Sequence, residues 1–245
     1  MKKTLLFLLL AGCLFSQCGK EMAAVTTTGT GGSLARFTIA GDYLYIVDES
    51  NLNVIDISDA ASPRAVQTIP VGFEIETIFP FKDKLFIGST SVIHIFSLED
   101  PSRPLKLSEA ISPAVMRRCD PVVAKDSVAF ATLRTNGPCG GFTSILAVYD
   151  ITDVLNPVQK AAVNMGEPYG LGYSDSALYV CDKQLGLQVF NITDAFNPRF
   201  VTQITEGSYI DVIPNGSTLI CWEETGMHLF DITEPLDPVL IAKIQ

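Results

Sequence analysis

The sequence is poor in basic residues and in histidine. Its 245 residues include 17 Lys and Arg against 27 Asp and Glu, a formal net charge of −10, and only 2 His. Loss of Lys2 and Lys3 with a signal peptide takes this charge from −10 to −12. Because nucleic-acid affinity depends largely on Lys and Arg that neutralise phosphates, the balance argues against a nucleic-acid partner.

The N-terminal apolar run is too short to span a membrane. It covers only Leu5 to Ala11, whereas a spanning helix needs roughly 20 residues. Together with Lys2 and Lys3 it predicts a signal peptide over residues 1–17. Cleavage before Cys18 or before Cys13 would leave a lipid-anchored cysteine, and plain secretion is the remaining alternative. LAGC at Cys13 resembles a bacterial lipobox, and the residues after Cys18 resemble the export signal of surface lipoproteins.

The rest of the chain is predicted to form a tether and one domain. Residues 18–33 are rich in Thr and Gly, which predicts a flexible tether. Residues 34–245 supply the apolar material for one large all-β core, because 47% of the sequence is hydrophobic and only 18% is charged. No sequence is left over for a second domain.

One short phrase occurs five times in the sequence. Its copies are VIDISDAASP, IFSLEDPSRP, VYDITDVLNP, VFNITDAFNP and LFDITEPLDP, ending at Pro63, Pro104, Pro157, Pro198 and Pro238. The successive steps between copies are 41, 53, 41 and 40 residues. A period near 40 with several short strands in each unit predicts a β-propeller of about five four-stranded blades.

The acidic residues of the phrase invite two interpretations. They stand at the end of an apolar strand, where a short side chain accepts hydrogen bonds from turn N–H groups. They are also candidate acids for catalysis or calcium binding. Because the same group recurs in unit after unit, we favour the structural turn role for Asp56, Asp150, Asn191 and Asp231.

Several further segments resemble the LVIVD-repeat proteins, a family of bacterial envelope β-propellers. They include LYIVD at Leu44, IETIFP at Ile75, LAVYDITD at Leu146 and LYVCD at Leu178. The resemblance implies a propeller fold and a surface or periplasmic location, and it carries over no catalytic residue. Relatives often have further blade-like sequence before the GGSLARFTI segment. The five units are therefore expected either to close a ring, to close it imperfectly, or to pair with another molecule.

The third unit contains 12 extra residues, which predict a long hairpin loop that includes Cys139. Cys119 lies 20 residues upstream on the preceding inner strand. In an oxidising compartment this pair is a candidate disulfide. A metal site is the weaker alternative because no His is nearby. Cys181 and Cys221 occupy one strand position in neighbouring units, and we interpret them as buried small residues rather than a second disulfide.

A ligand site in such a fold is expected at the mouth of the central channel, where the inner strands begin. Alignment of the units places there the candidate ligand residues Glu74, Glu76, Arg117, Arg118, Asp120, Glu167, Tyr169, Tyr209 and Asp211. This mixture of acids, arginines and tyrosines suits a sugar or a peptide. No cofactor or metal is predicted.

Two classes of function remain. The first is a non-catalytic binding or scaffold module, tethered by lipid to the membrane, that presents its loops to a protein, peptide or glycan. The second is an envelope enzyme resembling a glycoside hydrolase, which would need two opposed carboxylates across the channel mouth. A plugged channel would favour the binder, and a deep acid-lined cleft would favour the enzyme.

Overall fold

The structure is a computed structural model that describes residues 31–244, except for 91, 112–120 and 136–142. Within these residues the chain forms five four-stranded antiparallel sheets. This confirms the predicted all-β fold of five four-stranded blades. No helix in the described part of the chain is long and apolar enough to cross a membrane.

Each blade contains four strands that are consecutive in the chain. Blade 1 comprises β1 (Phe37–Ala40), β2 (Tyr43–Val47), β3 (Asn51–Asp56) and β4 (Arg64–Pro70). Blade 2 comprises β5 (Ile75–Phe81), β6 (Lys84–Ser89), β7 (Val92–Ser97) and β8 (Leu105–Ile111). Blade 3 comprises β9 (Val122–Lys125), β10 (Val128–Leu133), β11 (Ser144–Asp150) and β12 (Val158–Met165). Blade 4 comprises β13 (Pro168–Ser174), β14 (Ala177–Asp182), β15 (Gly186–Asn191) and β16 (Arg199–Ile204). Blade 5 comprises β17 (Tyr209–Asn215), β18 (Thr218–Glu223), β19 (Gly226–Asp231) and β20 (Val239–Ile244).

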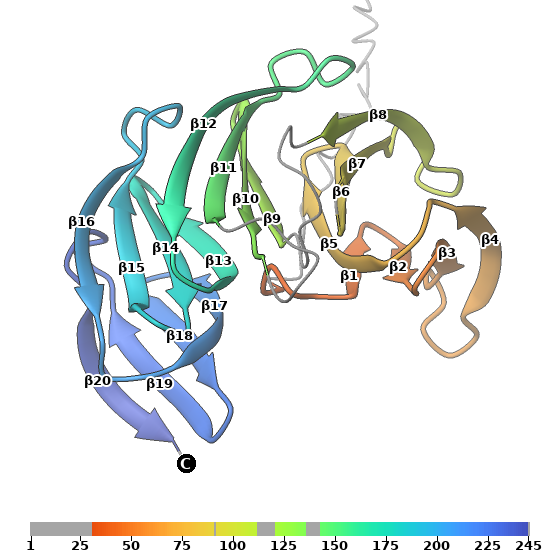
Figure 1. Cartoon of the computed structure of the whole chain (residues 1–245). Coiled ribbons are helices and arrows are strands. Elements are labelled where there is room, and N and C mark those ends of the chain that lie inside the picture. The colour runs from red at the N-terminus through yellow and green to blue at the C-terminus, as the bar shows by residue number, and fades with distance from the viewer. Residues whose placement is uncertain (1–30, 91, 112–120, 136–142, 245) are drawn as a thin grey trace, which may run out of the picture.

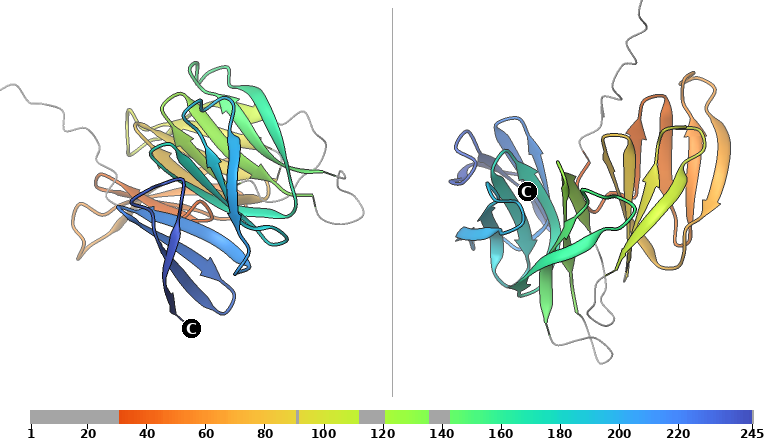
Figure 2. Two further views of the ribbon diagram at one scale, coloured as in Figure 1. Left: turned by 90° about the vertical axis from the view of Figure 1, so that its left-hand side faces the viewer. Right: turned by 90° about the horizontal axis from the view of Figure 1, so that it is seen from above.

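The blades follow one another around an arc. The first strand of each blade is innermost, and β1 packs on β5, β5 on β9, β9 on β13 and β13 on β17. Figures 1 and 2 show that the arc is open between blade 5 and blade 1. Among the described residues, no extensive strand-to-strand packing joins these two blades. The five units therefore do not close a continuous ring of blades.

The hydrophobic core lies between the blades rather than within one sheet. Four clusters of buried apolar side chains fill the spaces between blades 1 and 2, 2 and 3, 3 and 4, and 4 and 5. Alternate residues of each strand point to opposite faces, so blades 2, 3 and 4 each contribute one set to the preceding cluster and one to the following cluster, and blades 1 and 5 contribute to one cluster each. Burial of these faces against neighbouring blades is the main source of stability.

The repeated phrase forms the same corner in every blade. The side-chain oxygens of Asp56, Asp150, Asn191 and Asp231 each accept a hydrogen bond from the backbone N–H two residues later, at 2.8 to 3.0 Å. In blade 2, Ser97 accepts the corresponding bond from Glu99 at 3.2 Å. These bonds are the ones that the structural turn role requires.

The aspartate that ends the LVIVD-like segments caps the next hairpin. Asp48 Oδ1 accepts the N–H groups of Ser50 and Asn51 at 2.8 and 2.7 Å. These bonds, that from Ser50 above all, lower the pKa of Asp48 to about 2. Asp182 caps its own hairpin and also accepts the N–H groups of Gly166 and Glu167, which lie in the linker from blade 3 to blade 4. One carboxylate thus fixes both a hairpin and the approach to the next blade.

Two buried tyrosines connect neighbouring blades through their hydroxyl groups. Tyr45 of blade 1 donates to the carbonyl of Pro101 in blade 2 at 2.8 Å. Tyr179 of blade 4 donates to the carbonyl of Pro235 in blade 5 at 2.7 Å. Both acceptors lie in the repeated phrase, so the corners of blades 2 and 5 each receive a bond from the blade before them.

Tyr179→Phe is expected to lower the free energy of unfolding by about 1 kcal/mol, because the Pro235 carbonyl loses its donor while the ring packing remains. Chemical denaturation followed by circular dichroism measures the change. Tyr43→Phe is the control, since the described residues offer its hydroxyl no hydrogen-bond partner. Equal losses in the two variants would contradict the assigned role.

Candidate functional site

The segment that precedes blade 1 runs through the channel instead of lying outside it. We call residues 31–34 the strap. Ser33 is 1% exposed, and its hydroxyl donates to Asp211 Oδ1 at 3.2 Å and accepts the N–H of Leu171 at 2.7 Å. The N–H of Leu34 donates to Asp211 Oδ2 at 3.4 Å. The strap is therefore held by the innermost strands of blades 4 and 5. The flexible tether was predicted over residues 18–33, but Ser33 at its end is buried and held in place.

Asp211 is the carboxylate at the centre of this contact. It is 8% exposed, and burial raises its pKa from 3.8 to about 6, although the hydrogen bonds from Val212, Leu34 and Ser33 oppose that shift. Gly32 and Gly170 lie on its two sides, and a Cβ atom at either position would overlap its carboxylate oxygens. Asp211 was predicted as a ligand residue, but in the structure its oxygens bind the chain itself.

A small cavity of about 200 Å³ remains beside the strap. Its lining comes from the strap and from the innermost strands of four blades: Gly31, Phe79, Val123, Leu171, Gly172, Tyr173, Val212 and Pro214. The cavity wall is mostly apolar and carries no charged side chain. Beside the strap, the chain's own residues thus occupy the channel.

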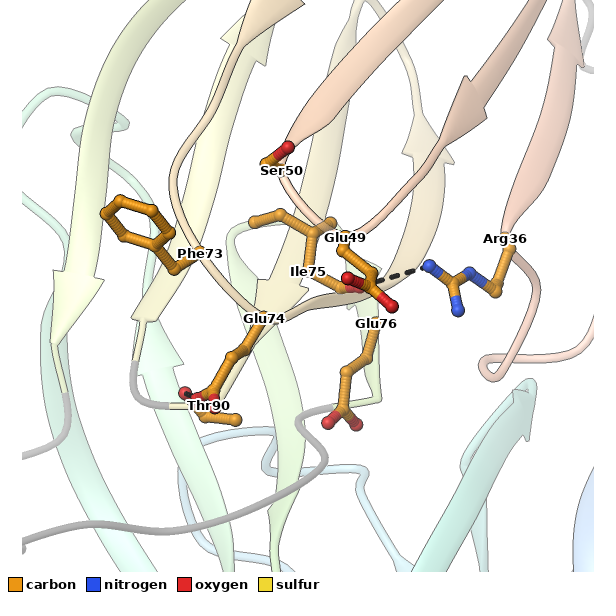
Figure 3. Close-up of a pocket in the computed structure, with 8 residues that line it drawn as sticks. All are labelled: Arg36, Glu49, Ser50, Phe73, Glu74, Ile75, Glu76 and Thr90. Carbon is orange, nitrogen blue, oxygen red and sulfur yellow. Dashed lines mark hydrogen bonds between the residues drawn. The ribbon is translucent and has the colours of Figure 1, made fainter.

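A larger hollow of about 620 Å³ opens between blades 1 and 2 (Figure 3). It lies on the face that carries the linkers into the innermost strands, which we call the linker face. Its lining residues are Arg36, Glu49, Ser50, Phe73, Glu74, Ile75, Glu76 and Thr90. The hollow brings together two of the predicted ligand residues, Glu74 and Glu76, with three residues that the sequence argument did not select, Arg36, Glu49 and Phe73.

The side chains of this hollow are held by neighbouring elements. Arg36 donates to the carbonyl of Ile75 at 3.4 Å, and Thr90 donates to Glu74 Oε2 at 2.8 Å. In Figure 3, Glu76 lies between these two pairs. Phe73 is 87% exposed and lines the hollow together with three glutamates, although its ring points away from Glu49 and Glu76 in Figure 3. An aromatic face, several acceptors and one guanidinium can together bind a sugar ring or a peptide.

Two other predicted ligand residues, Glu167 and Tyr169, meet on the linker face of blade 4. The Tyr169 hydroxyl lies 3.3 Å from Glu167 Oε1. Two cations lie over the Tyr169 ring, with the Arg134 guanidinium 3.7 Å and the Lys183 ammonium 4.8 Å from its centroid. Lys183 also forms an ion pair with Glu224 of blade 5 at 3.2 Å. This cluster links blades 3, 4 and 5 and is separate from the hollow.

Tyr209 is fully buried and belongs to a polar chain inside blade 5. Its hydroxyl lies 2.8 Å from His228 Nδ1, and His228 Nε2 lies 2.8 Å from Glu223 Oε1. Burial, the largest cause, raises the pKa of Tyr209. The sequence argument did not select Glu223, which stands in blade 5 where Asp182 stands in blade 4. Asp182 was not selected either, so no signal in the sequence pointed to Glu223.

The remaining predicted residues fall outside the described part of the chain. They are Arg117, Arg118, Asp120, both members of the candidate disulfide, Cys119 and Cys139, and the candidate lipidation residues Cys18 and Cys13. Cys181 and Cys221 are described, and both are buried free cysteines in the cluster between blades 4 and 5, as predicted. The prediction that they share one strand position is wrong, because Cys181 pairs with Leu187 whereas Cys221 pairs with His228, one residue further from its hairpin. Burial raises the pKa of both thiols. No group of three His, Cys, Asp or Glu side chains suited to a metal ion occurs among the described residues.

Solved structures support the class of fold. Pseudomonas aeruginosa periplasmic gluconolactonase PpgL is similar with a TM-score of 0.62 and 16% identity over 84% of this chain and 67% of that one. A protein from Lactobacillus plantarum has a TM-score of 0.68 and 15% identity, over 84% and 73% of the two chains. The match in a nidogen/laminin complex has a TM-score of 0.57 and 15% identity, over 83% and 76%. Similarity at these identities establishes a propeller-like fold alone, and the present chain is shorter than each of these proteins.

The sequence of blade 1 matches a known repeat. Residues 31–69, which contain the strap and nearly all of blade 1, match the LVIVD repeat. No curated protein matches the sequence. The resemblance predicted from the LYIVD-type segments is thus confirmed, and the chain is a β-propeller protein that contains an LVIVD repeat.

Proposed function

We propose that the protein is a non-catalytic binding module of the bacterial cell envelope. A lipid on Cys18, or on Cys13, holds it to the membrane, and its linker face binds a protein, peptide or glycan. The strap is the observation that carries this proposal. Because Ser33 and its neighbours occupy the channel, ligands meet an open hollow on the linker face rather than a deep enclosed cleft.

The shape of the hollow favours binding over chemistry. Phe73 presents most of its ring to solvent, and an aromatic ring beside hydrogen-bonding groups is a common surface for sugars and peptides. The nearby turns are rigid, because Asp48 fixes the β2–β3 hairpin from which Glu49 and Ser50 project. A preorganised surface of this kind loses little conformational entropy when it binds.

Phe73→Ala is expected to weaken binding about tenfold or more, because it removes the exposed aromatic contact. The probes are immobilised bacterial glycans and a random peptide library, with bound protein detected by fluorescence. Leu105→Ala is the control, since Leu105 is exposed on the outer strand of blade 2, away from the hollow. Binding that is unchanged in Phe73→Ala would exclude the hollow as the site.

An envelope enzyme that resembles a glycoside hydrolase is the second candidate. It is favoured by one observation, the three carboxylates of Glu49, Glu74 and Glu76 around a single hollow. Such an enzyme uses one carboxyl as acid and another as base or nucleophile. The test is whether the protein releases reducing sugar from the glycans that it binds. Release that is lost in Glu74→Gln and in Glu76→Gln, but not in Phe73→Ala, would establish this alternative.

A further inference from the structure

The hollow between blades 1 and 2 carries negative charge that the described residues do not neutralise. Its lining includes three glutamates, Glu49, Glu74 and Glu76. Against these three carboxylates stands one guanidinium, that of Arg36, which leaves the lining with a formal charge of −2. Within the described part of the chain, none of the glutamates forms an ion pair, and Arg36 donates to the carbonyl of Ile75 instead.

Other acidic side chains on the linker face do have basic partners. Glu224 forms an ion pair with Lys183 at 3.2 Å, and Glu206 forms one with Lys243 at 3.4 Å. The whole chain has 17 basic residues against 27 acidic ones, so it is short of cations. The hollow departs from the pattern of its own face, and this leaves room for a cation from outside the chain.

A ligand that covers the hollow has to compensate this charge. Such a ligand takes water away from the carboxylates, and a desolvated charge is costly unless an opposite charge pairs with it. A neutral sugar offers hydroxyl groups but no positive charge, and an acidic ligand adds repulsion. A Lys or Arg side chain supplies the opposite charge together with hydrogen-bond donors. A concave surface lined by one sign of charge also concentrates ligands of the other sign.

Phe73 adds a second contact, which favours an extended ligand. At 87%, it is the most exposed of the large apolar side chains in the described residues. Its ring points away from Glu49 and Glu76 (Figure 3). A compact amine therefore cannot contact the ring and these two carboxylates at once, whereas an extended segment of several residues can. The aliphatic stems of Lys and Arg also pack well on an aromatic face.

From these observations we propose that the ligand of the hollow is a basic peptide segment of a partner protein. Its Lys or Arg side chains lie against the three glutamates, and a neighbouring residue of the segment packs on Phe73. The proposal rests on the binding function proposed above and specifies the class of ligand. Because attraction between exposed charges is screened by ions, binding of this kind weakens as salt is added.

The test uses the full chain and an immobilised library of random decapeptides, and mass spectrometry identifies the peptides that bind. We expect Lys and Arg to be enriched among them. Labelled copies of the tightest binders are then titrated by fluorescence anisotropy. We expect their Kd to rise roughly tenfold between about 0.05 and about 0.5 M NaCl, because salt screens the attraction. Copies in which Gln replaces every Lys and Arg should bind weakly at both salt concentrations.

Glu49→Gln and Glu76→Gln test whether the hollow is the source of this preference. Each removes one charge with little change of shape, and we expect each to raise the Kd of the basic peptides about fivefold. Glu224→Gln is the matched control, since it removes the same charge from the same face but lies on blade 5. Its Kd should stay close to that of the wild type. Circular dichroism melts verify that the variants fold.

Several outcomes would overturn the proposal, and they separate it from the function on which it rests. Peptides that bind through Phe73 without preference for Lys or Arg, or glycans that bind in place of peptides, leave a binding module whose ligand is not basic. Equal losses in Glu76→Gln and Glu224→Gln mean that the net charge of the chain attracts the peptides. A preference that appears only after Arg117→Gln and Arg118→Gln means that the chain's own arginines neutralise the hollow. Binding that Phe73→Ala leaves unchanged refutes both the ligand and the site.

Discussion

We expect the wild-type protein to lose stability as the pH rises from about 4 to about 6, and we expect Asp211→Asn to abolish this loss. Burial raises the pKa of Asp211 to about 6 in the folded chain, against 3.8 as the ordinary value. Between these values the unfolded chain has released this proton and the folded chain still holds it, so a rise in pH favours unfolding. The difference amounts to about 3 kcal/mol of unfolding free energy.

The measurement is the unfolding free energy from urea denaturation at a series of pH values, for the wild type and the variant. Subtraction of the two profiles isolates Asp211 from other groups. His94, for instance, has its pKa lowered chiefly by burial, which makes its contribution to stability fall as the pH decreases, in both proteins alike. Parallel profiles for wild type and variant would show that Asp211 is not the buried acid described here.

Gly32→Ala is expected to expel the strap from the channel. The new methyl group would overlap Asp211 Oδ2, and Gly170 on the opposite side leaves that carboxylate no room to retreat. Overpacking of this kind costs about 1 to 3 kcal/mol, to which the lost hydrogen bonds of Ser33 and Leu34 add. Limited proteolysis should then cut the strap many times faster, and urea denaturation should show the lower stability.

Gly31→Ala is the matched control in the adjacent residue. A Cβ atom at Gly31 would lie 3.4 Å from Ala35 Cβ, an ordinary contact. We expect its proteolysis rate and stability to stay close to wild type. If both alanine variants behave alike, the close approach of Gly32 to Asp211 does not hold the strap.

The blades were predictable from the sequence because their signals are local and repeated. In blade 4 the short run YGLGY from Tyr169 to Tyr173 lies within β13, and the apolar run from Ala177 to Cys181 lies within β14. The corner phrase was interpretable for the same reason, since its hydrogen bonds join residues two positions apart. Alternation and turn chemistry need no knowledge of distant contacts.

The strap was not predictable by the same means. Gly32 and Ser33 belong to a Gly- and Thr-rich stretch whose composition is that of a linker, yet they pack against residues nearly 180 positions away. Likewise, Asp211 and Tyr209 were predicted as ligand residues, but contacts with Ser33 and His228 occupy their polar atoms. Long-range pairing of this kind leaves no periodic trace in the sequence.

The hollow was half predictable. Glu74 and Glu76 emerged from alignment of the inner strands, whereas Glu49 comes from a hairpin of the preceding blade. From the sequence, a closed ring, an imperfectly closed ring and pairing with another molecule were all left open, because the number of units alone does not fix the curvature of the arc. Only the packing of the innermost strands decides it.

The route of the strap also determines how a pulling force enters the molecule. Tension on the N-terminal end reaches Ser33 and Leu34 first, where it is borne by bonds to Asp211 and Leu171 on the innermost strands of two blades. Blade 1, at the free end of the arc, would otherwise be peeled away strand by strand. The strap therefore transfers an N-terminal pulling force to the innermost strands of blades 4 and 5, and blade 1 carries little of that force.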